Sequence, residues 1–354
     1  MTDRGLKKTS GKAFAGKNEP PVCSVCIANF NGRDVIRSCI DSILEQDCRC
    51  PVEIIVHDDA STDDSAALIR ENYPFVRLLT SRENVGYCVS NNRMAAVATG
   101  KYLLFLNNDA SLFPDAIRAL KAFSVSQGDS AILGLPQYEM ESRALIDRGS
   151  LLNIFLYPFP NKNKGRRDVG MVIGACLWIP KALWDELGGF PDYFYSLAED
   201  LYLCLLARLR GYRVNVLPES GFLHWVGKSI GGGKLCKEGL QTTYARRCHS
   251  ERNRIFVMIL CYPAAMLGLL LPLHLVLLAA EGLMLSLVKR NALIWKNIYG
   301  AVFRALWREK SRLIRDRKRI QKNRKISLRR LLSSFICYPY KLKMLLLHGV
   351  PSIL

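Results

Sequence analysis

The chain has 354 residues, an apolar fraction of 49% and a net charge of +19. The apolar fraction is enough for a hydrophobic core and excludes a largely disordered protein, and the length allows one large domain or two ordinary ones. The charge is uneven, because the segment 289–330 carries sixteen Lys and Arg residues against Glu309 and Asp316. Such a segment is typical of proteins that meet nucleic acid or anionic lipid.

The first 21 residues are polar and rich in Lys and Gly, and we expect them to form a flexible tail and no secretory signal. After the tail, apolar runs and helical patterns alternate. We predict strands at 22–30, 52–56, 76–79 and 102–106, and helices at 34–45, 63–72, 91–99 and from Pro114 onward. This alternation predicts a parallel sheet covered by helices on both faces. Ligands of such sheets bind beyond the carboxyl ends of the strands.

Polar clusters stand at three of these strand ends. They are Asn29 and Asn31 after the first strand, Asp58 and Asp59 after the second, and Asn107, Asn108 and Asp109 after the fourth. Because parallel strands end at one edge of the sheet, these clusters predict a shared site there.

The segment 131–233 is mixed. We predict strands at 133–138, 169–180 and 212–217, and helices at 180–187 and 199–210. Gly174 and Ala175 are small enough for a ligand to approach the backbone closely.

The segment 255–288 is almost entirely apolar, although Pro263 and Pro272 interrupt it. It is long enough to span a membrane. Basic residues flank it on both sides, Arg246, Arg247, Arg252 and Arg254 before it and Lys289 and Arg290 after it. Positive charge at both ends favours two cytoplasmic ends, and therefore a re-entrant helical hairpin or in-plane helices. A buried helical hairpin of a soluble protein is the alternative.

The twelve cysteines do not form a metal-binding pattern. Cys23 and Cys26 lie three residues apart in a predicted strand, so they point to opposite faces. We interpret the cysteines as reduced thiols of a cytoplasmic protein. The alternative is reactivity through proximity at Cys39, Cys48 and Cys50.

Transfer of a sugar from a nucleotide diphosphate needs a cation beside the leaving diphosphate, a grip on the nucleoside, and a carboxylate that takes the acceptor proton. Asp109 is the candidate ligand of Mg²⁺ or Mn²⁺, although a carboxylate there also caps turns. Asp59 is placed to hold the nucleotide, and Asp200, next to Glu199 at a helix start, is the candidate base, although acids are favoured at any helix start. His224 is a candidate second contact with the metal or the diphosphate.

Several motifs in order resemble glycosyltransferase family 2, the inverting enzymes with the GT-A fold. They are SVCIANFNG, EIIVHDDASTDDS, ENVGYCVSNN and GKYLLFLNND, followed by the segment 174–214 with its GACLWIP and LAEDLYL pieces, and LHWVGKS. The resemblance is greatest to bacterial rhamnosyltransferase-like enzymes of lipid-linked glycan synthesis, which also carry an RN pair, here Arg252-Asn253, before apolar helices and a basic tail.

The resemblance implies roles for these positions. Asp59 would contact the base or ribose, Asp109 would bind the cation as the last residue of a DxD-like element, Asp200 of the Glu199–Asp200 pair would deprotonate the acceptor, and His224 would lie near the diphosphate. The remaining substrate contacts would come from Ala28, Asn29, Asn31, Asp58, Asn84, Gly86, Asn107, Asn108, Gly174, Ala175 and Trp225. The sequence departs from the family at Asn107 and Asn108, which leave only Asp109 charged, and at His57, which replaces an apolar residue.

We therefore expect a tail at 1–21, a GT-A domain at 22–245 with a nucleotide-binding half at 22–130 and an acceptor half at 131–245, and a helical membrane-association region at 246–354. The expected protein is an inverting, cation-dependent glycosyltransferase on the cytoplasmic face of a bacterial inner membrane, where it is monotopic or peripheral and acts on a lipid-linked glycan, with no nucleic-acid partner. Three alternatives stay open: a catalytically idle scaffold, a nucleic-acid binder that uses the basic region, and a sugar-nucleotide pyrophosphorylase. The pyrophosphorylase would need a Gly-rich loop with Arg and Lys after the first strand, which 29–33 does not supply.

Overall fold

The computed structural model describes residues 20–48, 50–225, 232–236 and 239–338, together with 343, 346, 347, 352 and 353. Most of the tail expected at 1–21 and most of the LHWVGKS segment after Trp225 therefore lie outside the described residues.

A seven-stranded sheet, ordered β12-β6-β11-β4-β1-β2-β3, forms the centre of the molecule. Its strands are β1 (Cys23–Asn29), β2 (Val52–Asp58), β3 (Arg77–Thr80), β4 (Tyr102–Leu106), β6 (Ala131–Gly134), β11 (Cys176–Pro180) and β12 (Arg213–Val216). β11 runs antiparallel to its neighbours β4 and β6, and the other described pairs in this sheet are parallel. The chain proceeds from β1 to β2 and β3 and then returns to place β4 on the other side of β1, so the order of strands reverses between β1 and β4. Such a reversal opens a crevice at the carboxyl ends of the two strands.

Helices cover both faces of the sheet, as the alternation predicts. Side chains of α1 (Ile36–Leu44), α2 (Ser65–Asn72) and α4 (Ala116–Ser126) share one core with Cys23, Val25 and Ile27 of β1. Side chains of α3 (Tyr87–Val97), α5 (Lys181–Leu187) and α6 (Glu199–Leu209) share the other core with Cys26 of β1. Cys23 and Cys26 thus belong to opposite faces, as expected from the period of a strand.

A second sheet, ordered β5-β13-β7-β8, stands at the end of the first. It consists of β5 (Ala110–Leu112), β13 (Phe222–His224), β7 (Gln137–Glu139) and β8 (Leu145–Asp147). The smaller strands are β9 (Leu151–Leu152) and β10 (Pro158–Phe159), which pair together, and β14 (Gly232–Cys236), β15 (Gly239–Thr242) and β16 (Ser352–Ile353).

Three expected elements differ in the structure. The single strand expected at 133–138 is two strands, β6 and β7, in different sheets, because Pro136 lies between them and cannot donate to a ladder. Of the strand expected at 169–180, only β11 forms, because the backbone around Gly174 turns toward Asp200. Helix α3 begins at Tyr87, one turn before the expected start at 91, after Gly86 in a left-handed conformation.

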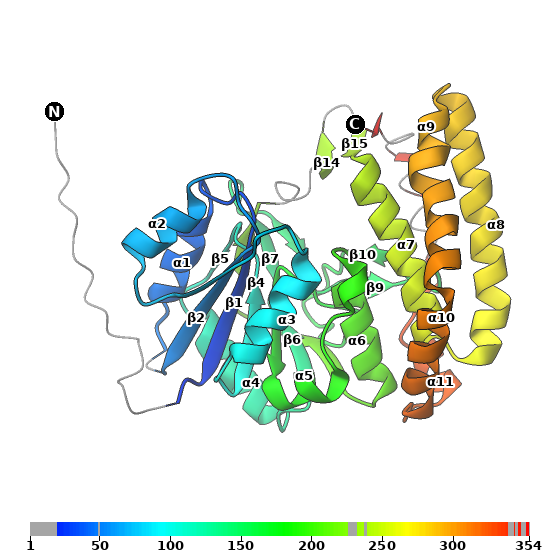
Figure 1. The fold of residues 1–354 in the computed structure, drawn as a ribbon. Coiled ribbons are helices and arrows are strands. Elements are labelled where there is room, and N and C mark those ends of the chain that lie inside the picture. Colours follow the sequence, from blue (N-terminus) through cyan, green and yellow to red (C-terminus); the bar gives the residue numbers. More distant parts are fainter. Residues whose placement is uncertain are drawn as a thin grey trace.

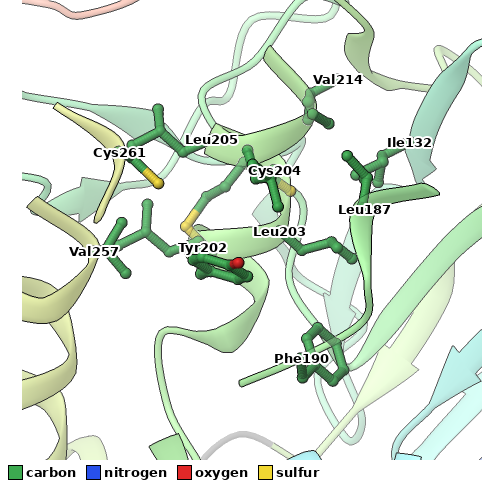
Figure 2. Close-up of a cluster of buried hydrophobic side chains, with 14 of the residues drawn as sticks. Ile132, Leu187, Phe190, Tyr202, Leu203, Cys204, Leu205, Val214, Val257 and Cys261 are labelled. Carbon is green, nitrogen blue, oxygen red and sulfur yellow. The ribbon is translucent and has the colours of Figure 1, made fainter. Parts of the chain in front are cut away.

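The C-terminal part is a set of long helices beside the sheet domain (Figure 1). It contains α7 (Tyr244–Cys261), α8 (Ala264–Val288), α9 (Ala292–Ile294), the π-helical turn η2 (Trp295–Tyr299), α10 (Gly300–Lys322) and α11 (Leu328–Leu332). The expected domain limit at 245/246 falls in the first turn of α7. The last turns of α7 are part of the main core, where Val257 and Cys261 lie against α6 (Figure 2).

The apolar stretch 255–288 is therefore divided. Residues 255–261 are buried in α7, and Pro263 precedes α8. Pro272 lies inside α8 and does not end it, contrary to the expected interruption. Two of the four arginines expected to flank a membrane segment before 255 are paired within the protein: Arg247 pairs with Glu251 and Glu281, and Arg254 with Glu251. They cannot be counted as charges at a membrane surface.

The cysteine thiols are mostly buried, and burial raises the pKa of Cys39 well above its ordinary value. The sulfur atoms of Cys48 and Cys50 lie 2.8 Å apart. Burial, followed by the bond to Cys48, raises the pKa of Cys50 to about 12. A raised pKa lowers the thiolate fraction, which disfavours reactivity at Cys39 and Cys50.

Candidate active site

Asp59, directly after β2, holds the loop that leads into α3. Its carboxylate is buried and accepts hydrogen bonds from the backbone N–H groups of Val85 and Gly86, both at 2.8 Å. Gly86 has φ +87°, and a side chain there would collide with the ring of Tyr195. Asn84 adds a contact, because its Oδ1 accepts the hydroxyl proton of Tyr195 at 2.7 Å. Asp59, Asn84 and Gly86 therefore come together, and they face the loop that precedes α6.

The other polar residues after β1 and β2 bind mainly to one another. The Asn29 amide donates to Asp58 at 2.9 Å and accepts from the Asn108 amide at 2.9 Å. The side chain of Asn31 accepts from the backbone N–H of Thr62 at 2.8 Å, and Ala28 pairs with His57 in the sheet. These contacts give Asn29, Asp58 and Asn108 a structural role, and substrate contact by them stays a prediction.

Asp109 and His224 lie side by side at the junction of the two sheets. Oδ1 of Asp109 is 3.1 Å from Nε2 of His224, and both side chains are buried. The pairing of β5 with β13 sets His224 opposite Ala110. The amide of Gln137 lies 2.9 Å from Nδ1 of His224 and fixes the orientation of the ring. Trp225 joins this group through its backbone N–H, which donates to the carbonyl of Asp109 at 3.1 Å.

The pair fits a divalent cation as a partial ligand set. A carboxylate oxygen and an imidazole nitrogen are both protein ligands of such ions. Among the described residues, however, no three His, Cys, Asp or Glu side chains come together as a complete metal site. A cation bound here would have to take its other ligands from elsewhere, such as a diphosphate and water.

Glu199 and Asp200 begin α6 behind a strained turn. Tyr195, Leu197 and Ala198 all have positive φ, between +64° and +73°, a conformation that is costly for residues with side chains. Both carboxyls are buried, and Asp200 accepts backbone N–H bonds from Gly174 at 2.9 Å and from Leu201 at 2.7 Å.

Burial governs the protonation of this acidic pair. Desolvation is the largest cause that raises the pKa of Glu199, and the charge of Asp200 adds to it. Desolvation also raises the pKa of Asp200, against the opposing effect of the two N–H bonds. A carboxylate with a raised pKa is a stronger base than an exposed one.

Segment 173–175 connects Glu199 and Asp200 to the residues around Asp59 and Asp109. Its Gly174 carbonyl accepts the hydroxyl proton of Tyr87 at 2.9 Å, next to the loop held by Asp59. Its Ala175 carbonyl accepts the backbone N–H of Asn107 at 3.0 Å, two residues before Asp109. The structure therefore brings the surroundings of Asp59, Asp109 and Asp200 to one rim, at the carboxyl ends of β1, β2 and β4.

Helix α7 adds residues that we did not predict as part of the site. The charge of Arg246 is near enough to Glu199 to lower the pKa of that carboxyl against its burial. His249 packs edge-on against Tyr195 with ring centroids 5.5 Å apart. Asn253 donates to the carbonyls of Ser196 and Leu197 at 2.9 and 2.7 Å. The Arg252-Asn253 pair is visible in the sequence, but its contact with the turn before α6 depends on helix packing.

Residues 24–188 match the model of Glycosyl transferase family 2. The chain is 38% identical over 105 residues to an uncharacterized glycosyltransferase, YibD, of Escherichia coli, covering 29% of this chain and 30% of that protein. It is 34% identical over 218 residues to the hyaluronan synthase of Pasteurella multocida, covering 60% and 22%. It is 25% identical over 213 residues to an N-acetylglucosaminyl-diphospho-decaprenol L-rhamnosyltransferase of Mycobacterium tuberculosis, covering 51% and 69%.

Two solved structures share the fold at low identity. TarS 1-349 of S. aureus has a TM-score of 0.50 at 16% identity, covering 85% of this chain and 90% of that one. GalNAc-T7 with UDP, GalNAc and Mn²⁺ has a TM-score of 0.53 at 14% identity, covering 69% and 48%. The matches span less than a third of the length of the first curated relatives. With its GT-A-like sheet and the match at 24–188, the chain carries a glycosyl transferase family 2 domain.

Proposed function

We propose that the chain is an inverting glycosyltransferase that moves one sugar from a nucleotide-diphosphate donor to a lipid-linked glycan in cell-surface polysaccharide synthesis. The observation that carries the proposal is the single rim on which Asp59, Asp109 and Asp200 are connected through Tyr87, Gly174 and Ala175. The lipid-linked acceptor is supported by the rhamnosyltransferase relative, whose name describes such an acceptor, and by the apolar helix α8.

In the proposed reaction Asp200 accepts the proton of the acceptor hydroxyl as that oxygen attacks the anomeric carbon. The new carbon–oxygen bond forms on one face of the sugar, and the bond to the diphosphate breaks on the other, which inverts the configuration. Asp59 and its loop hold the nucleoside. A divalent cation held by Asp109 and His224 would neutralise charge on the diphosphate.

Replacement of Asp200 tests the proposal. We expect Asp200→Asn to lower kcat by about 10²- to 10⁴-fold, the usual contribution of a general base, while nucleotide binding persists. The measurement is release of nucleoside diphosphate across a panel of nucleotide sugars with Mn²⁺, alongside binding by calorimetry. Asp185→Asn is the matched control, because Asp185 is exposed and pairs with Lys181 within α5. Transfer by Asp200→Asn at the rate of Asp185→Asn would remove Asp200 from the mechanism.

The same assay tests the scaffold alternative, and DNA binding with liposome flotation tests the nucleic-acid alternative. A catalytically idle scaffold would release no nucleoside diphosphate from any donor, with or without Mn²⁺. A nucleic-acid binder would shift duplex DNA in a salt-sensitive manner and would not float with liposomes.

A further inference from the structure

A cavity of about 380 Å³ lies between α10 and the segment 188–193, away from the rim. Arg312, Arg315 and Arg319 line its helical side, and Asn92, Tyr193 and Tyr202 are among the residues that line the other side. Its lining includes no residue predicted as part of the active site. Its volume falls in the range of pockets that hold small ligands.

The three arginines share one side of α10 because they follow a spacing of three and four residues. The packed side of α10 carries Val302, Ala305, Leu313 and Ile320, which are buried. Packing of these side chains fixes the backbone of α10. It therefore fixes the points along the cavity from which the arginine side chains extend.

The carboxylates in the cavity wall already have partners. Asp316 accepts the hydroxyl proton of Tyr193 at 3.3 Å, and Asp192 accepts from the amide of Asn92 at 2.7 Å. Arg312 pairs with Glu309 at 3.2 Å and lies 5.0 Å above the ring of Tyr193.

Arg315 and Arg319 differ from these groups. Neither makes an ion pair with a carboxylate in the part of the chain that the structure describes. Arg315 and Arg319 lie four residues apart on α10, so both side chains can reach one anion in the cavity without breaking an ion pair. The guanidinium fork matches the oxygens of a phosphate in bidentate geometry.

We propose that this cavity is a second ligand site that binds a phosphate or diphosphate group between Arg315 and Arg319. The proposal adds a ligand site to the proposed function. Only the source of the bound group rests on that function: the group belongs to a lipid headgroup or to the diphosphate of a lipid-linked acceptor. Tyr193 lines the cavity and stands two residues before the turn 195–198, which leads into α6 with Glu199 and Asp200.

Binding of inorganic pyrophosphate to the full chain, measured by calorimetry in EDTA at low salt, tests the site without donor or cation. We expect R315Q/R319Q to weaken pyrophosphate binding at least tenfold. K310Q/K318Q is the matched control, because it removes the same charge from α10 outside the cavity. No binding by the wild type, or equal weakening in both double variants, would overturn the proposal. D200N should lower kcat for transfer and keep this binding, which separates a failure of the site from a failure of the proposed reaction.

A second measurement identifies the source. A lipid headgroup predicts that adding phosphatidate to phosphatidylcholine vesicles increases flotation of the wild type and of K310Q/K318Q but not of R315Q/R319Q. If the source is the acceptor diphosphate, we expect the wild type and both double variants to float equally. In R315Q/R319Q, and not in K310Q/K318Q, the KM for a lipid-linked acceptor should rise while the KM for the donor is unchanged. If R315Q/R319Q matches the control in both measurements, the proposed site is wrong.

Discussion

His249 of α7 packs against Tyr195 beside the candidate site, and its surroundings change its pKa. Burial lowers the pKa of His249 from 6.5 to about 4, and the nearby charge of Arg252 contributes. The folded protein therefore favours the neutral imidazole, while the unfolded chain protonates near pH 6.5. The stabilisation is complete above pH 6.5 and is lost as the pH falls from 6.5 toward 4.

Replacement of His249 isolates this effect. We expect the free energy of unfolding of the wild type to fall more steeply between pH 6.5 and 4.5 than that of His249→Gln, which has no imidazole to protonate. Urea unfolding of both proteins at several pH values measures the difference. Parallel curves over this window would contradict the buried, neutral state of His249.

At the scale of elements, α7 holds the strained turn before α6. The Asn253 side chain is fully buried, and its amide donates to the carbonyls of Phe194, Ser196 and Leu197 at 2.7 to 2.9 Å. Arg252 donates to the Phe194 carbonyl as well, at 2.8 Å. These bonds offset the cost of the three unfavourable backbone conformations at Tyr195, Leu197 and Ala198. We interpret Asn253 as a positioning residue that acts through Glu199 and Asp200.

We expect Asn253→Ala to lower stability by about 1 to 3 kcal/mol, because buried carbonyls lose their donor, and to lower kcat per folded molecule more than tenfold, because the turn relaxes. Urea unfolding and transfer assays at matched folded fraction measure the two effects. Asn153→Ala is the control, because buried Asn153 also holds a turn, through Phe155 and Tyr157, away from the rim. Equal kcat in the two variants would make Asn253 purely structural.

The sequence predicted the alternating elements of residues 22–130 because each buried strand there is a short apolar run between turn residues. It did not predict that 131–139 divides between two sheets, because the pairing partners of β6 and β7 are distant in the chain. The acids Asp59, Asp109 and Asp200 could be predicted because each follows a strand or begins a helix. Arg246, His249 and Gln137 could not be predicted, because only the packing of α7 and β7 brings them to the rim.

At the scale of the whole molecule, α8 forms an apolar flank. It is the one described helix long and apolar enough to cross a membrane, and only 22% of its most apolar window is buried. Leu269, Leu273, Val276, Leu283 and Leu287 are exposed and lie on one face. The helix runs beside α7, along the domain and not away from it (Figure 1). A spanning position would carry the polar domain into the bilayer, so we propose that α8 lies in the plane of the membrane surface.

Polar substitutions on this flank test the orientation. We expect L269Q/L287Q to lower the partition coefficient for liposomes on the order of 100-fold or more, because each buried Leu contributes roughly 1.5–3 kcal/mol, while the melting temperature is unchanged. F75Q/V125Q is the control, since Phe75 and Val125 are exposed apolar residues elsewhere on the domain. Flotation of L269Q/L287Q equal to that of the control would exclude α8 as the lipid contact.

The half-buried pair of Arg247 in α7 and Glu281 in α8, 2.7 Å apart, has a practical consequence for anyone who would trim this protein to make it easier to purify. Removing α8 would take Glu281 away from Arg247, leave the pair of Arg247 with Glu251, and uncover Ile255. Removing α7 as well would take Asn253 away from the turn before Asp200. We therefore expect detergent, and not a shorter gene, to keep the fold of the chain intact during purification.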